Sequence, residues 1–117
     1  MAHSICHIEL GATDVKRTSG FYESVFDWKF SNAMGDEYLT FDTGQGLGGG
    51  LYKTPEVKSG GGIVFYILVN DIDASMSKIT GAGGQQKIAK TEIPNVGWYG
   101  QFADPEGNLI GLFTPKA

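Results

Sequence analysis

The segment that decides the fold is WYGQFADPEGNLIGLF, residues 98–113. Its centre, DPEGN at positions 104–108, has the composition of a tight turn. Pro105 presets one backbone angle, Gly107 permits a positive one, and Asp104 and Asn108 can bond nearby amides. Aromatic and aliphatic runs flank this turn on both sides, so the segment predicts a closing β-hairpin.

Working outward from this hairpin, the chain shows one pattern twice: a strand, a helix and then three strands. In the first copy we expect a helix capped by Thr13 or Asp14 and running to Phe26. In the second copy, Asn70 or Asp71 caps a helix that the glycine-rich residues 81–84 end. The expected strands cover 4–11, 28–30, 37–42, 47–53, 63–69 and 85–89, followed by the hairpin.

Aligning the two helix caps makes the duplication explicit. His7 precedes Asp14 by the same interval as Val64 precedes Asp71. An internal repeat of this kind fixes the fold class more firmly than any single element. We therefore predict one α+β domain over residues 1–117, made of two tandem βαβββ units, about 3–54 and 62–114, that form a curled, barrel-like mixed sheet.

Composition narrows the partners and the compartment. The chain has 117 residues, a net charge of -4 and a pI near 5.0, which argues against a nucleic-acid or membrane partner. Cys6 is the only cysteine, so no disulfide forms within one chain. No apolar run is long enough to span a bilayer, and residues 1–4 lack the features of a signal peptide. A cytoplasmic protein is the expectation.

The whole chain resembles the vicinal oxygen chelate superfamily, which includes glyoxalase I, fosfomycin resistance proteins, bleomycin resistance proteins and extradiol dioxygenases. The resemblance rests on the strand at 6–10, the Phe21-Tyr22 pair, the helix start at 70–73 and the terminal hairpin. It implies the glyoxalase/bleomycin resistance fold and a homodimer, either swapped or unswapped. It leaves the activity open, because this fold hosts isomerases, transferases, dioxygenases and antibiotic-binding proteins.

The resemblance also implies where a divalent metal would bind. Metal-dependent members have a ligand early in the first strand of each unit and a glutamate on the last strand of each unit. The matching residues here are His7, Val64, Gly50 and Gly111. A single imidazole does not hold a divalent ion, since stable sites recruit three or four protein donors. We therefore expect no metal of the family type and no cofactor.

A pocket for a small-molecule ligand is still expected. Side chains alternate along a strand, so Glu9 shares a face with His7, Tyr66 with Val64, and Phe113 with Gly111. By resemblance to the fosfomycin resistance members, Tyr99 and Gln101 also face the pocket, and a loop carrying Thr91 and Glu92 closes one end. The candidate ligand-binding residues are His7, Glu9, Tyr66, Tyr99, Gln101 and Phe113; no catalytic residue is assigned.

Three functional hypotheses follow. The first is a glyoxalase-like small-molecule binding protein without the usual metal. The second is a lyase, isomerase or dioxygenase of the same superfamily, with an unusual metal site on His7 and Glu9, or with Glu9 alone as the base. The third is an interaction module with a filled cavity, in which His7 and the aromatic residues are ordinary core. The strands at 47–53 and 108–113 are expected to be sheet edges that a second copy covers.

Overall fold

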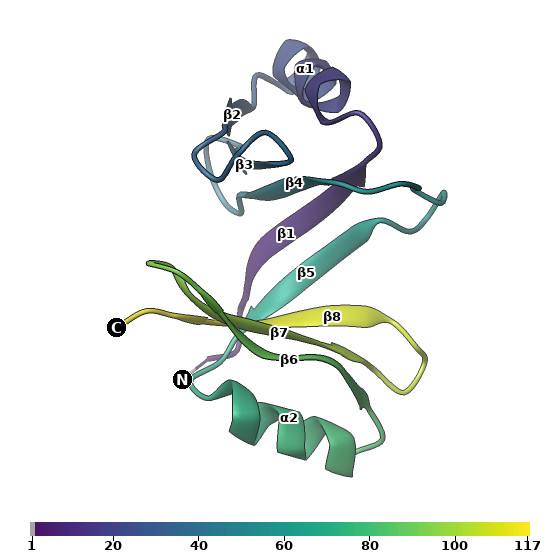
Figure 1. The fold of residues 1–117 in the computed structure, drawn as a ribbon, viewed down its shortest axis with the longest axis vertical. Helices are drawn as coiled ribbons and strands as arrows, with labels where there is room; N and C mark the ends of the chain where they lie inside the picture. The colour runs from purple at the N-terminus through teal and green to yellow at the C-terminus, as the bar shows by residue number, and fades with distance from the viewer. Residues whose placement is uncertain (1) are drawn as a thin grey trace. The chain divides into compact units, whose positions relative to one another are not determined.

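The computed structural model describes residues 2–117 and confirms an α+β protein (Figure 1). The chain divides into two compact units. The N-terminal unit comprises residues 7–64, and the C-terminal unit comprises residues 65–117 together with residues 2–6. The elements follow the order strand, helix and three strands twice, as the internal repeat predicts.

The N-terminal unit places a mixed four-stranded sheet against one helix. The strand order is β2-β3-β4-β1, in which β1 and β4 are parallel and the other pairs are antiparallel. Only the first two residues of β1 belong to the other unit. The elements are β1 (Ile5–Ala12), α1 (Val15–Phe26), β2 (Lys29–Ser31), β3 (Tyr38–Asp42) and β4 (Gly49–Lys53).

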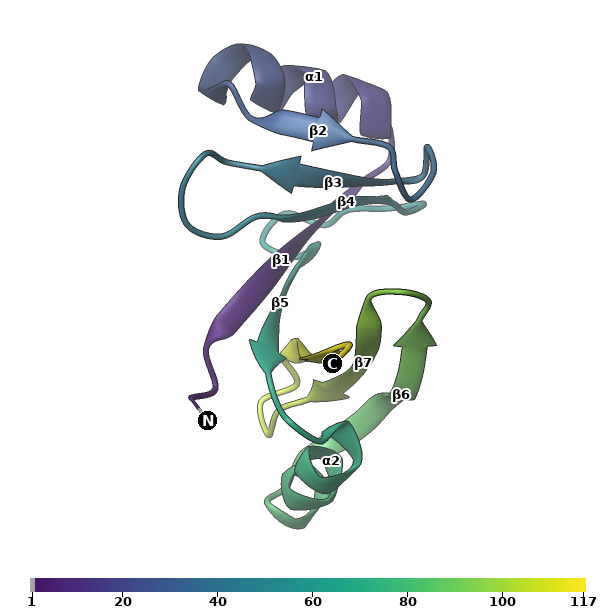
Figure 2. The ribbon, with the colours of Figure 1, turned by 90° about the vertical axis from the view of Figure 1, so that its left-hand side faces the viewer.

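The C-terminal unit repeats this arrangement, with strand order β5-β8-β7-β6. Here β5 and β8 are parallel, while β7 pairs antiparallel with both β8 and β6. Figure 2 shows β6 and β7 running in opposite directions. The first two residues of β5 belong to the N-terminal unit. The elements are β5 (Ile63–Leu68), α2 (Ile72–Gly81), β6 (Gln85–Ile93), β7 (Gly97–Ala103) and β8 (Leu109–Pro115).

The predicted caps and the closing hairpin are confirmed. Of each pair of candidates, the structure selects the aspartate: Asp14 accepts a hydrogen bond from the amide of Arg17, and Asp71 from that of Ala74. In the turn between β7 and β8, Asp104 accepts bonds from the amides at positions 106 and 108 and from the Asn108 side chain. These bonds to its charged form lower the pKa of Asp104, the Asn108 side chain contributing most.

In each unit the helix covers one face of the sheet and makes the core there. The N-terminal core centres on Leu51, with Ala12 and Val15. The C-terminal core centres on four buried residues, Val69, Ile72, Met76 and Leu112. The alternation of side chains along each strand then places the neighbouring residues on the opposite face, which the unit's helix does not cover; we call this the open face of each unit.

Three sequence expectations are wrong in detail. Thr91 and Glu92 lie within β6, paired with β7, rather than in a loop, because β6 extends to Ile93. The strands at 47–53 and 108–113 are not edges: β4 pairs with β1 and β3, and β8 pairs with β5 and β7. In each unit, parallel pairing with the first strand covers the side of the last strand that a simple hairpin would leave unpaired.

Only part of the apolar surface of α1 packs against the sheet. The helix buries Val15 and Ser19, whereas Phe21, Val25 and Phe26 are each more than half exposed. With 3.6 residues per turn, burying positions 15 and 19 turns 21 and 25 away from the sheet. Neither helix within residues 2–117 has the length and apolar character needed to cross a membrane.

Candidate functional site

A chain of three polar side chains lies on the open face of the N-terminal unit. His7 and Glu9 come from β1, two residues apart, and therefore point the same way. Tyr38 begins β3 and reaches across β4 to both of them. The Tyr38 hydroxyl donates to Glu9 Oε2 at 2.8 Å and is 2.9 Å from His7 Nε2.

The direction of these bonds fixes the proton on the histidine. A phenol has one proton, and Tyr38 gives it to Glu9. His7 Nε2 must then donate to Tyr38 Oη, so the neutral imidazole carries its proton on Nε2. The result is a directed chain, His7 to Tyr38 to Glu9, that ends on a carboxylate whose side chain is only 16% exposed.

Burial makes this imidazole neutral. Desolvation lowers the pKa of His7 below its usual 6.5, and the nearby charge of Glu9, 4.0 Å away, opposes that shift without reversing it. At neutral pH the group is therefore an uncharged hydrogen-bond donor on Nε2. The cluster carries one net negative charge, on Glu9, and holds it within reach of a proton-bearing phenol.

A second polar and aromatic cluster lies on the open face of the C-terminal unit. Tyr66 on β5 pairs with Gly111 on β8, and Gln101 on β7 pairs with the same glycine from the other side. Gln101 Nε2 donates to the Tyr66 hydroxyl at 2.8 Å. Tyr99 packs edge-on against Tyr66, with ring centroids 6.5 Å apart, and pairs with Phe113 in the β7–β8 ladder.

Both clusters are built on a glycine covered by a tyrosine ring. A Cβ atom at Gly111 would fall on the ring of Tyr66, well inside contact distance. A Cβ at Gly50 would likewise fall on the phenol of Tyr38. These are the two positions where the resemblance places a metal-binding glutamate. In each unit, a tyrosine therefore occupies the volume that a side chain at that position would need.

The residues at the four expected ligand positions do not fit the family's divalent metal. Of these four residues only His7 carries a donor atom, and a single imidazole does not hold a divalent ion. Val64 carries no donor atom, and neither do Gly50 and Gly111. Among residues 2–117, no three or more His, Cys, Asp or Glu side chains are grouped closely enough to hold a metal ion.

The structure brings the predicted site residues together as two separate sets. His7 and Glu9 contact each other through Tyr38, and Tyr66, Tyr99, Gln101 and Phe113 form the other cluster. Sequence reasoning missed Tyr38. The signal that could have found it is the two-residue period of a strand: Tyr38 shares a face with Thr40, which pairs with Gly50 in the β3–β4 hairpin. Using this signal requires the register of that hairpin.

Comparison with known proteins now gives the class. The chain matches the family described as the Glyoxalase/Bleomycin resistance protein/Dioxygenase superfamily over residues 4–112. The chain belongs to this superfamily, as the resemblance of its sequence implied. The duplicated βαβββ order and the placement of each helix on one face of its sheet agree with that membership.

Particular relatives refine this picture. A glyoxylase-like domain-containing protein of Didymella fabae is 32% identical over 119 residues, covering 94% of this chain and 92% of that protein. The Mycobacterium bovis protein CFP32, named as a glyoxylase, is 31% identical over 98 residues; the match covers 81% of this chain but only 38% of the relative. Methylmalonyl-CoA epimerase from Mycobacterium tuberculosis has a similar fold, with a TM-score of 0.75 at 15% identity, covering 97% of this chain and 88% of that one.

Proposed function

We propose that this chain is a glyoxalase-like protein that binds a small, partly aromatic molecule without the divalent metal of its metal-dependent relatives. The observation that carries the proposal is the tyrosine ring over the glycine at each glutamate position, Tyr38 over Gly50 and Tyr66 over Gly111. The family positions that would hold a cation are filled by phenols, which are suited to hydrogen bonding and stacking.

The C-terminal cluster supplies the features of a site for an aromatic ligand. Tyr99 and Phe113 are half-buried and offer ring surface, and Gln101, held by the hydroxyl of the buried Tyr66, offers an amide that fixes orientation. Small-molecule sites in proteins combine apolar and aromatic walls with a few placed polar groups. The N-terminal cluster offers the carboxylate of Glu9 and the phenol of Tyr38 to a hydrogen-bonding ligand.

A direct test is a titration of EDTA-treated protein with p-cresol, followed by amide chemical shifts. We expect perturbations around Tyr66, Tyr99 and Gln101 without added metal. Gln101→Leu should weaken binding about three- to tenfold, the value of one hydrogen bond. Gln85→Leu, on the exposed start of β6, is the matched control. Binding that needs Mn²⁺ or Zn²⁺, or that survives Gln101→Leu unchanged, contradicts the proposal.

A second candidate function is proton transfer by the N-terminal cluster. The hydrogen-bonded chain from His7 through Tyr38 to Glu9 favours it, because a weakly exposed carboxylate next to a proton-bearing phenol can act as a base. The measurement is exchange of the α protons of hydroxyacetone in D₂O. Exchange catalysed by the wild type and lost in Glu9→Gln supports this function; equal rates in both proteins exclude it.

Homodimerisation is part of the proposal. The exposed Phe21, Val25 and Phe26 of α1 supply apolar surface that a second copy would cover. Sedimentation equilibrium tests this directly: Phe21→Ser and Phe26→Ser should shift a dimer to monomer, and a wild-type monomer at all concentrations contradicts it. The cytoplasmic location remains a prediction from the sequence.

A further inference from the structure

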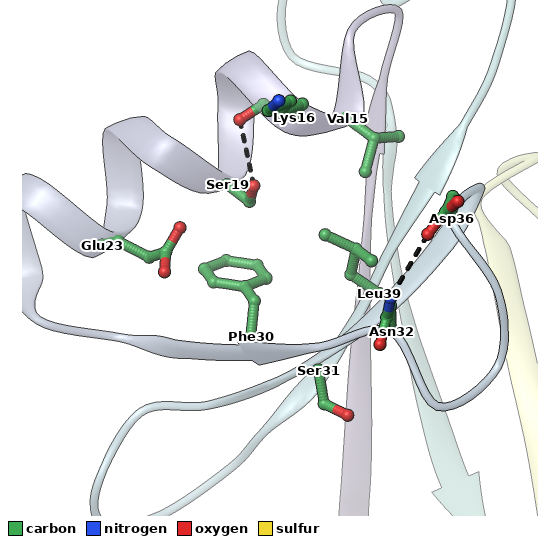
Figure 3. Close-up of a pocket in the computed structure, with 9 residues that line it drawn as sticks. All are labelled: Val15, Lys16, Ser19, Glu23, Phe30, Ser31, Asn32, Asp36 and Leu39. Carbon is green, nitrogen blue, oxygen red and sulfur yellow. Dashed lines mark hydrogen bonds between the residues drawn. The ribbon is translucent and has the colours of Figure 1, made fainter.

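A cavity lies between α1 and the strands β2 and β3 of the N-terminal unit (Figure 3). Its volume is about 740 Å³, within the range of about 300–1,000 Å³ typical of small-molecule sites. Val15, Phe30 and Leu39 give it apolar walls, and Figure 3 shows the Phe30 ring directed toward the underside of the helix. This cavity is on the helix-covered face of the sheet, opposite the open face that carries His7 and Glu9.

The internal duplication explains why this unit is hollow. Counting from the capping aspartates, Ser19 occupies the position in α1 that Met76 occupies in α2. Both residues are 5% exposed, but the methionine extends over Gly100, with its Cε 3.4 Å from where a Cβ would lie there. Ser19 is too short to reach the sheet, and its hydroxyl bonds back to the carbonyl of Lys16 at 3.0 Å.

The charged groups at the cavity favour a cation. Glu23 lies beside the Phe30 ring at one end, and Asp36 lies at the other end, where it accepts a bond from Asn32 at 3.3 Å (Figure 3). Lys16 is the single basic residue of the lining. The lining therefore carries a net charge of -1, within a chain whose net charge is -4. The negative charge of the lining and that of the whole chain both repel an anion and attract an ammonium group.

We propose that the α1 cavity is a second binding site, for a small molecule with an apolar or aromatic body and one ammonium group. The body packs between Val15, Phe30 and Leu39 beneath Ser19, and the ammonium group pairs with Glu23. The site is independent of the proposed metal-free ligand site, because it uses none of the side chains of either cluster and lies on the helix-covered face of the N-terminal sheet.

The test uses 2-phenylethylamine as the probe, with 2-phenylethanol as the neutral analogue and phenylacetate as the anionic one. Titration of the full chain, followed by amide chemical shifts, should perturb α1, β2 and the segment 32–39 with the amine. The amine should bind most tightly and phenylacetate most weakly. Amine binding no tighter than that of phenylacetate, or no perturbation in this region, overturns the proposal.

Ser19→Met is the decisive variant, because it places in α1 the residue that fills the matching space in the other unit. It should weaken amine binding at least about tenfold, one factor of ten being 1.4 kcal/mol. The matched control is Ser24→Met, the same change at an exposed position of the same helix, outside the cavity. Equal amine affinities in the two variants contradict the site.

A second variant keeps the proposal testable if the Ser19→Met protein does not fold. Glu23→Gln keeps the shape and removes one charge, so the amine should bind about threefold more weakly while 2-phenylethanol binding is unchanged. Glu56→Gln, exposed in the connector and outside the cavity, controls for net charge. A loss of amine affinity as large in Glu56→Gln as in Glu23→Gln overturns the pairing with Glu23.

Discussion

Tyr66 is the direct partner of Gly111 in the parallel ladder of β5 and β8, and its ring covers the Cα of that glycine. Tyr66 is itself 5% exposed, so the ring has little freedom to move aside. A tyrosine also covers the glycine of the other unit, where Tyr38 lies over Gly50, although the direct partner of Gly50 in β3 is Thr40. Glycine at these two positions is therefore a packing requirement of the tyrosines.

The first prediction concerns this packing. Gly111→Ala should lower the free energy of unfolding by about 1–3 kcal/mol, because the added methyl group meets the Tyr66 ring in an already filled space. Urea denaturation measures the change. The double variant Tyr66→Ala/Gly111→Ala should lose less than the sum of the two single changes, since the contact is gone. Strict additivity would show that ring and methyl group do not interact.

The second prediction concerns metal. Melting temperatures with and without Mn²⁺, Zn²⁺, Ni²⁺ or Fe²⁺ should be the same, because the residues at the ligand positions do not form a donor set. A true site would add about 2.7 kcal/mol of stability at a metal concentration of one hundred times the dissociation constant. A stoichiometric metal ion in elemental analysis would disprove the prediction if His7→Ala removes both the ion and the stability that the metal adds.

The third prediction concerns pH. The pKa of His7 is below 6.5 in the folded protein, so the unfolded chain binds a proton more readily than the folded one. The contribution of His7 to stability is complete above pH 6.5 and declines as the pH falls through the folded-state value. In His7→Gln this decline should disappear, as seen by denaturation at several pH values.

The imidazole resonances give an independent readout of the same titration. The chain has two histidines, and the signal that disappears in His7→Gln identifies the C2 proton of His7. We expect the C2 proton of His7 to titrate below pH 6.5, and a shift of its pKa toward 6.5 in Glu9→Gln would contradict the opposing influence of Glu9. Loss of the Glu9 charge should instead lower the pKa of His7 further.

The fourth prediction concerns Tyr38. Tyr38→Phe should cost about 1–3 kcal/mol, because it leaves the partly buried His7 and Glu9 without the phenol that bonds to both. Thermal or urea unfolding measures the loss. Tyr52→Phe, on the neighbouring strand β4, is the matched control. Equal small losses in both variants would mean that the polar chain contributes nothing to stability.

The fifth prediction is a stabilising change. Gly20 lies in the interior of α1, and a Cβ there meets nothing within 4 Å. Gly20→Ala should therefore raise the free energy of unfolding by up to about 1 kcal/mol, through the higher helix propensity of alanine. A fall in stability would show that the helix depends on the flexibility of that residue.

Local chemistry made part of this fold predictable. The two capping aspartates and the turn at 104–108 act through bonds to nearby amides, so their sequence neighbours are enough to identify them. The edges of the sheets were predicted wrongly because the parallel partners of β4 and β8 lie far away in the chain. Such pairings leave no short-range signal.

The candidate site shows the same division. That His7 and Glu9 share a face follows from the two-residue period of a strand. That Tyr38 joins them depends on the register of β3 against β4 and on the space above Gly50, neither of which the sequence states. The buried position 19 of α1 is a serine, which a search for apolar residues passes over.

The glycine covered by tyrosine has a consequence for descent as well as for structure. A carboxylate side chain introduced at position 50 or 111 by one substitution would meet the aromatic ring. Losing the ring first leaves a void in its place. Each evolutionary route to a carboxylate at these positions thus passes through a weakened intermediate.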